Sequence, residues 1–150
     1  MPFPPDRFLE FGATAQSVNF ECASGGAYGR VKLAINRGIL WLTIEDDASG
    51  DDLLACFQQA LASGHLPPTI PTLVDLTGFT GHVEWPAIHR IRNLAPWGTG
   101  KDARSQVAYV SRDSFFRFML KIVAVLFPLT QHRLFDDRDS ALHWLAPPKA

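Results

Sequence analysis

The chain has 150 residues, of which 47% are hydrophobic and 19% are charged, and its formal net charge is -1. This length and composition are typical of one globular domain with a single core. Basic and acidic residues are interspersed, so the chain lacks the broad positive field that drives nucleic-acid binding, and no nucleic-acid partner is expected. The longest apolar stretch, around 122–129, is shorter than the roughly 20 residues that span a bilayer, which predicts no integral membrane segment.

The first residues, 1–15, are rich in proline and lack hydrophobic periodicity, which predicts a tail followed by a single domain over 16–150. The start has no positively charged opening, apolar run or cleavage site, so we predict a cytoplasmic location.

Cys22 and Cys56 are far apart, in segments of different predicted type. They form no zinc spacing or redox pair, and we interpret them as buried free thiols.

Three strands with alternating apolar and polar residues are predicted over 17–23, 31–36 and 39–44. The turns between them, 24–29 and 36–38, contain glycine and predict an antiparallel hairpin. Helices are then expected over 51–62, 86–94, 114–127 and 137–145, and short strands over 73–76, 107–110 and 132–135. Alternation of strands and helices predicts an α/β domain with a mixed, mainly parallel sheet flanked by helices. Its core is predicted to include Trp41, Leu73, Val74, Val107 and Trp144.

The acidic segment 45–52 lacks the alternating ligand spacing and the distal glutamate of a calcium loop. We interpret it as the beginning of the helix over 51–62. Ser49 or Gly50 is expected to be the N-cap, and Gly64 is expected to end the helix. Asp51 and Asp52 would stabilise the first turn electrostatically.

Three stretches resemble the SpoIIAA-like group of the STAS superfamily, the fold of anti-sigma-factor antagonists. They are 36–44, 73–78, and the ending 135–137 with 141–145, and the similarity extends over about 31–145. The group's STAS/Sec14-like branch is also similar to lipid-binding domains. The resemblance implies a STAS-like fold and a non-enzymatic binding or regulatory module, without a cofactor, for a protein partner or an apolar, lipid-like ligand.

STAS switch proteins carry a phosphorylatable serine at the start of the helix that follows the strand ending in Asp75. The segment 77–86 contains no serine here, and its hydroxyl groups belong to Thr77 and Thr80, which we interpret as turn or capping residues. We predict that this loop binds the ligand or partner. Its predicted binding residues are Asp75, Thr77, Phe79, Thr80 and Trp85.

The predicted helix over 114–127 is apolar on more than one side, with Arg117 and Lys121 as its charged residues. One side, Phe115, Met119, Ile122 and Leu126, is expected to face the sheet. Phe116, Val123 and Phe127 are then expected to face a partner subunit of a homodimer, a protein partner or an apolar ligand. The alternative is that they pack on the N-terminal tail or a neighbouring helix.

Enzymatic candidates are sparse. A small hydrolase-like enzyme centred on Asp75 and His82 is the alternative function, because a carboxylate after a parallel strand lies where α/β folds bind ligands. His82 and His89 are about 10 Å apart even on one helix, so no metal site is predicted. No catalytic residue is assigned.

Basic residues cluster around 97–100. They allow either an anion-binding interpretation or a solvated helix end and loop, and they are Arg90, Arg92, Lys101 and Arg104.

Overall fold

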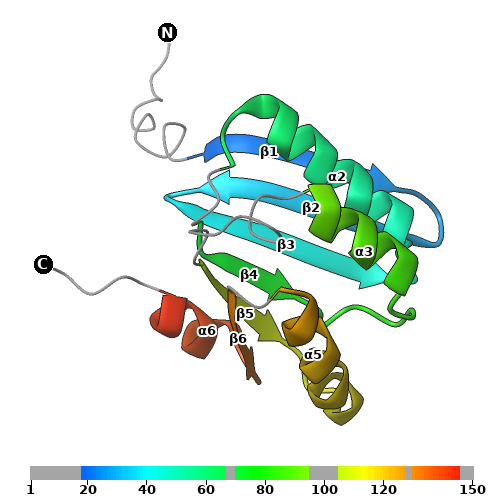
Figure 1. Cartoon of the computed structure of the whole chain (residues 1–150), viewed down its shortest axis with the longest axis vertical. Coiled ribbons are helices and arrows are strands. Elements are labelled where there is room, and N and C mark those ends of the chain that lie inside the picture. The colour runs from blue at the N-terminus through cyan, green and yellow to red at the C-terminus, as the bar shows by residue number, and fades with distance from the viewer. Residues whose placement is uncertain (1–17, 67–69, 95–104, 128–129, 146–150) are drawn as a thin grey trace, which may run out of the picture.

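The computed structural model describes residues 18–66, 70–94, 105–127 and 130–145. Its centre is a six-stranded sheet whose strands follow one another in chain order (Figure 1). The strands are β1 (Val18–Gly25), β2 (Gly29–Asn36), β3 (Ile39–Asp46), β4 (Thr72–Asp75), β5 (Ser105–Val110) and β6 (Thr130–Phe135). β1, β2 and β3 pair antiparallel, and β3 to β6 pair parallel. The predicted mixed, mainly parallel sheet with an antiparallel hairpin is confirmed, whereas the predicted tail over 1–15 lies outside the described residues.

Helices cover the sheet unequally. α2 (Gly50–Ser63), α3 (Trp85–Leu94) and α5 (Ser114–Leu126) lie against one face, and α6 (Arg138–Leu145) lies against the other (Figure 1). α2 packs on β1 and β2, whereas α6 packs on β4, β5 and β6. Since α6 covers only the parallel half, the second face of β1 and β2 presents alternating exposed side chains such as Glu21, Arg30 and Lys32. None of the described helices is long and apolar enough to cross a membrane.

The core consists of two clusters, one on each face of the sheet. Because side chains alternate along a strand, β4 contributes Val74 to the cluster beneath α2, α3 and α5, and Leu73 to the cluster beneath α6. The core prediction is confirmed for these two residues, which are 7% and 1% exposed. Trp41, Val107 and Trp144 pack against the clusters but remain half-buried.

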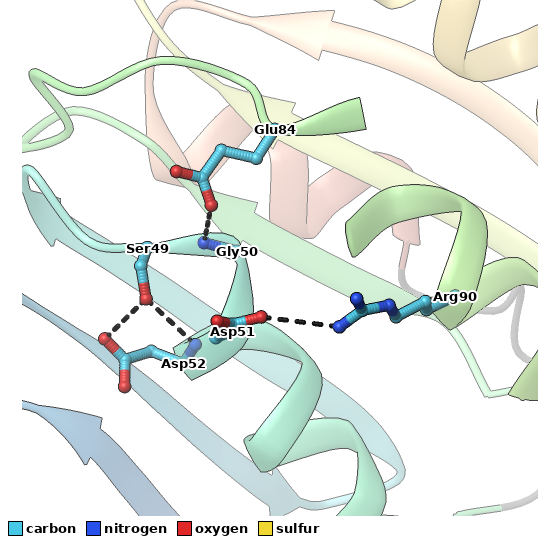
Figure 2. Close-up of polar contacts among 6 residues, drawn as sticks. All are labelled: Ser49, Gly50, Asp51, Asp52, Glu84 and Arg90. Atoms are coloured by element: carbon cyan, nitrogen blue, oxygen red, sulfur yellow. Dashed lines mark hydrogen bonds and ion pairs between the residues drawn. The ribbon is translucent and has the colours of Figure 1, made fainter. Parts of the chain in front are cut away.

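The beginning of α2 follows the sequence prediction. The Ser49 hydroxyl accepts a hydrogen bond from the Asp52 backbone N–H at 3.1 Å, so Ser49 is the N-cap (Figure 2). Gly64 ends the helix with a positive φ of 80°. Two contacts join the start of α2 to neighbouring segments. The Gly50 N–H donates to Glu84 Oε1 at 2.5 Å, and Arg90 of α3 lies 3.6 Å from Asp51 (Figure 2).

The two cysteines are free and meet where α2 packs on β1 and β2. The Cys22 thiol donates to the Cys56 carbonyl at 3.7 Å, and the Cys56 thiol donates to the Val31 carbonyl at 3.6 Å. Cys56 is fully buried as predicted, whereas Cys22 is half-buried. Burial raises the pKa of Cys22, and it raises the pKa of Cys56 to about 12. Both thiols are therefore protonated packing groups rather than nucleophiles.

Candidate functional site

An open groove of about 1080 Å³ runs along the edge where β4, β5 and β6 end. Parallel strands place their carboxyl ends at the same edge, and two backbone hydrogen bonds extend the pairing beyond the strands. The Leu76 N–H donates to the Val110 carbonyl at 2.9 Å, and the Ser111 N–H donates to the Phe135 carbonyl at 3.1 Å. The groove is therefore bounded by the three segments that follow these strands: 76–83, 111–113 and 136–138.

Apolar and polar side chains occupy different parts of this groove. Its inner side chains are Leu76 and Val110, which are buried, with Phe116 and Met119 from α5 beside them. Its outer side chains are exposed and polar: Thr77, Thr80, Arg112, Asp113, Asp136, Asp137 and Arg138. With Asp75, the groove has four carboxylates against two guanidinium groups, so its own charge is negative.

The Asp75 carboxylate is fully engaged. Its Oδ1 accepts from the Thr77 N–H at 3.0 Å and from the Thr77 hydroxyl at 2.7 Å, and its Oδ2 lies 3.7 Å from Arg138 Nε. The turn role predicted for Thr77 is confirmed. His82 also lines the groove, but no hydrogen bond joins it to Asp75 among the described residues. A hydrogen bond between these two side chains would have favoured the hydrolase-like alternative.

The acidic side chain at the start of α6 has a structural partner. Asp137 accepts from the Ser140 N–H at 2.8 Å and from the Ser140 hydroxyl at 3.2 Å. These hydrogen bonds lower the pKa of Asp137, and the positive charge of Arg112 contributes in the same direction. Asp137 is thus the N-terminal cap of α6. Within the part of the chain that the structure describes, no three His, Cys, Asp or Glu side chains lie close enough to hold a metal ion.

A second space, a cavity of about 160 Å³, lies between the sheet and the helices α2, α3 and α5. Most of its wall is apolar, with side chains from β2 to β6 and from all three helices. The cavity and the groove share part of their lining. The residues that line both are Leu76, Phe79, His82, Val83 and Phe116. The two spaces are therefore neighbours separated by a single layer of side chains.

A tyrosine and a histidine form the main polar contact in the cavity wall. His132 Nε2 lies 3.2 Å from the Phe127 carbonyl oxygen, which can only accept, so Nε2 carries the proton. His132 Nδ1 then accepts from the Tyr109 hydroxyl at 2.9 Å. Burial lowers the pKa of His132 and raises the pKa of Tyr109, so both groups are neutral near pH 7.

The lowered pKa of His132 predicts a pH-dependent contribution to stability. Because its folded-state pKa is below the ordinary value of about 6.5, the unfolded chain binds more protons between the two values. The stabilisation by neutral His132 is complete above about pH 6.5 and is lost as the pH falls towards the folded-state pKa. His132→Gln keeps a donor and an acceptor but does not titrate. In urea unfolding at pH 7.5 and 5.5, the parent should lose more stability than this variant; equal losses would contradict the assignment.

The predicted binding residues fall into three groups. Asp75, Thr77 and Thr80 line the groove, and Phe79 lines both the groove and the cavity. Trp85 begins α3 and lines neither space. Two of the arginines in the anion-binding interpretation already have partners within the protein. Arg90 forms an ion pair with Asp51, and Arg92 donates a hydrogen bond to the Leu126 carbonyl at 2.7 Å. Lys101 and Arg104 lie outside the described residues.

The predicted orientation of α5 is wrong in part: Leu126 packs on the core as predicted, whereas other side chains of the helix face the opposite way to the prediction. Ile122 was expected to face the sheet but is 41% exposed. Phe116, Val123 and Phe127 instead face inwards: Phe127 is buried, Phe116 and Val123 pack on the core, and all three line the cavity. The outward apolar side chains are Phe118, Ile122 and Val125. The Phe115 side chain lies outside the described part of the chain. A partner subunit therefore cannot contact Phe127 directly, whereas a ligand inside the cavity can.

Comparison with known proteins bears on the fold. No protein-family model and no curated protein matches the chain. The chain is similar to the crystal structure of an uncharacterised DUF3478-family protein from Shewanella loihica, which is described as having a SpoIIAA-like fold. The match covers 85% of this chain and 97% of that protein, with a TM-score of 0.55 and 17% sequence identity. The chain has a SpoIIAA-like fold. An anti-sigma factor antagonist from Mycobacterium paratuberculosis also matches, at 15% identity over 83% of this chain and 94% of its own, with a TM-score of 0.49.

In this SpoIIAA-like fold, sequence reasoning found one side of the groove and missed the other. Arg112, Asp113, Asp136 and Arg138 were not predicted as site residues, although they follow β5 and β6 directly. The available signal was positional, because residues that follow adjacent parallel strands meet at the same edge. This argument predicted Asp75 at the end of β4. The same argument for β5 and β6 predicts the polar residues that follow those strands.

Proposed function

We propose that this chain is a binding module whose groove at the ends of β4, β5 and β6 holds a basic segment of a protein partner. The observation that carries the proposal is the arrangement of the groove, with apolar side chains inside and polar side chains of net negative charge outside. Protein interfaces have the same anatomy, an apolar centre within a polar rim. Four carboxylates against two guanidinium groups favour a partner that carries Lys or Arg beside an apolar side chain.

The state of the polar groups favours binding over catalysis. A general acid or base must be available to the substrate and has a pKa suited to proton transfer. Asp75 is held by Thr77 and Arg138, and Asp137 caps α6. Arg138 also lies over the Trp41 ring, 5.5 Å from its centre. The groove thus presents a fixed pattern of charge, which suits recognition.

The proposal is tested by selecting short peptides on the immobilised full-length protein from a random displayed library. The selected peptides should be enriched in Lys and Arg next to an apolar residue. Asp136→Arg reverses one exposed charge of the groove and should weaken these peptides about tenfold, since it removes an attraction and adds a repulsion. Affinities would be measured by fluorescence anisotropy at low and physiological salt.

Glu21→Arg is the matched control, because it makes the same change in net charge on exposed β1, away from the groove. It should bind the selected peptides as the parent does. Chemical shift mapping should place the peptide against Thr80 and Ser111. Peptides without basic enrichment, or equal binding by Asp136→Arg and the parent, would contradict the proposal.

A further inference from the structure

We propose that the cavity beneath α2, α3 and α5 is a binding site for a small, uncharged aromatic molecule of about the size of benzene. This site is distinct from the groove and does not rest on binding of a protein partner there. The apolar ligand predicted from the sequence fits this space, but the space limits its size. The volume is about 160 Å³. A cavity of about 150 Å³ lined by apolar side chains stays dry and binds benzene.

Aromatic rings surround this space. Tyr109 and Phe116 have ring centres 5.6 Å apart, and Tyr109 and His132 are stacked with centres 5.8 Å apart. Other rings in the wall come from three separate segments: Phe57, Phe79 and Phe127. Rings attract a further ring in offset or edge-to-face geometry at centre distances of about 4.5–7 Å. A flat aromatic ligand can make such contacts with several walls at once.

The buried polar groups of the wall already have partners within the protein, and His82 is exposed at the surface. Tyr109 bonds to His132, and His132 bonds to the Phe127 carbonyl. Thr72 donates to the Ile70 carbonyl at 3.4 Å, and Thr130 lies 3.3 Å from the Ser105 hydroxyl. Among the described residues, the buried side-chain atom without a partner is Asn36 Oδ1, which is not in this wall. An apolar ligand therefore leaves no wall group unsatisfied, whereas a charged ligand would lose its hydration without compensation.

The lining indicates where a ligand reaches the cavity. Most wall residues are buried or half-buried, but His82 and Glu84 are exposed, and Gly50 lies beside them. Gly50 begins α2, and His82 and Glu84 belong to the segment that precedes α3. The hydrogen bond from the Gly50 N–H to Glu84 joins the two (Figure 2). A ligand that enters on this side reaches the cavity past the exposed His82 and Glu84 side chains.

Fluorine NMR with fluorobenzene as the probe tests the site on the full-length protein. The parent should bind the probe saturably, with a Kd of about 1 mM or tighter. The charged analogue 4-fluorobenzoate should bind at least about 100-fold more weakly, because the buried side chains of the wall offer no free partner for its carboxylate. Absence of saturable binding up to the solubility limit of fluorobenzene, or equal binding of the two probes, would overturn the proposal.

Two matched variants locate the binding. Val123→Phe fills the cavity from α5 and should weaken fluorobenzene binding at least about tenfold. Val125→Phe is the same change on the same helix at a side chain that is 75% exposed, and it should leave binding unchanged. If Val123→Phe does not fold, Val107→Phe fills the space from β5 instead. Full binding by a folded cavity-filling variant would overturn the proposal.

Failure at this site is distinguishable from failure at the groove. Asp136 lines the groove and not the cavity, and Val123 lines the cavity and not the groove. Asp136→Arg should therefore bind fluorobenzene as the parent does. Loss of fluorobenzene binding in this variant would place the probe in the groove and would count against the cavity.

Discussion

Leu73→Ala should lower the free energy of unfolding by about 2–5 kcal/mol, the range for large-to-small changes in a core. Leu73 is 1% exposed, and β4 is paired on both sides, with β3 and with β5. Its side chain belongs to the cluster beneath α6, with Val110 and Leu145. Strands on both sides hold the backbone of β4, so the space left by the missing atoms cannot close easily.

Urea unfolding of Leu73→Ala and of Val125→Ala would measure this effect. Val125 is 75% exposed on α5, and its truncation should change stability by no more than about 0.5 kcal/mol. Unaltered m-values would show that the two variants unfold from the same native state. A loss below about 1 kcal/mol for Leu73→Ala would mean that α6 does not cover the sheet as described.

Gly29→Ala should cost about 3 kcal/mol, at the upper end of the usual range for overpacking. A Cβ atom on Gly29 would lie 2.3 Å from the Ala48 backbone nitrogen and 2.6 Å from the Asp47 carbonyl carbon. Both are backbone atoms, so a side-chain rotation cannot relieve the contact. The segment that leads from β3 into α2 would have to move away from β2.

Gly26→Ala is the control for Gly29→Ala in the same turn. A Cβ atom on Gly26 meets nothing within 4 Å, so this variant should remain within about 1 kcal/mol of the parent. Thermal unfolding followed by circular dichroism would compare the three proteins. Equal stability of the two variants would contradict the close approach of Gly29 to Ala48.

The elements of the fold were predictable because their signals are local. Ser49 and Gly64 mark the two ends of α2, and alternating side chains define β2. The orientation of α5 was not predictable in the same way. This helix is apolar around most of its circumference, so periodicity alone cannot decide whether Val123 or Ile122 faces the sheet. The decision depends on how α5 packs on its neighbours, which is tertiary information.

The groove residues likewise divide into those with a local sequence signal and those brought together only by tertiary structure. Asp75 and Thr77 form a local turn and were predicted, whereas Asp136 joins them only because β4, β5 and β6 lie side by side. The cavity has no sequence signature, since apolar side chains that line a space have the same pattern as those that fill it. Cys22 and Cys56 illustrate the same point, because their contact arises only from the packing of α2 on β1.

The segment 76–83, which lies between the groove and the cavity, is attached to the end of β3 by two backbone hydrogen bonds. The Asp46 N–H donates to the Gly78 carbonyl at 2.7 Å, and the Thr80 N–H donates to the Asp46 carbonyl at 2.8 Å. Neither bond uses a side chain of the segment. Thr80 is exposed and could therefore be varied while the loop kept its attachment to the end of β3, whereas Phe79 packs on the core and lines the cavity. The exposed surface of the proposed groove can consequently diverge, in nature or by engineering, at little cost to folding.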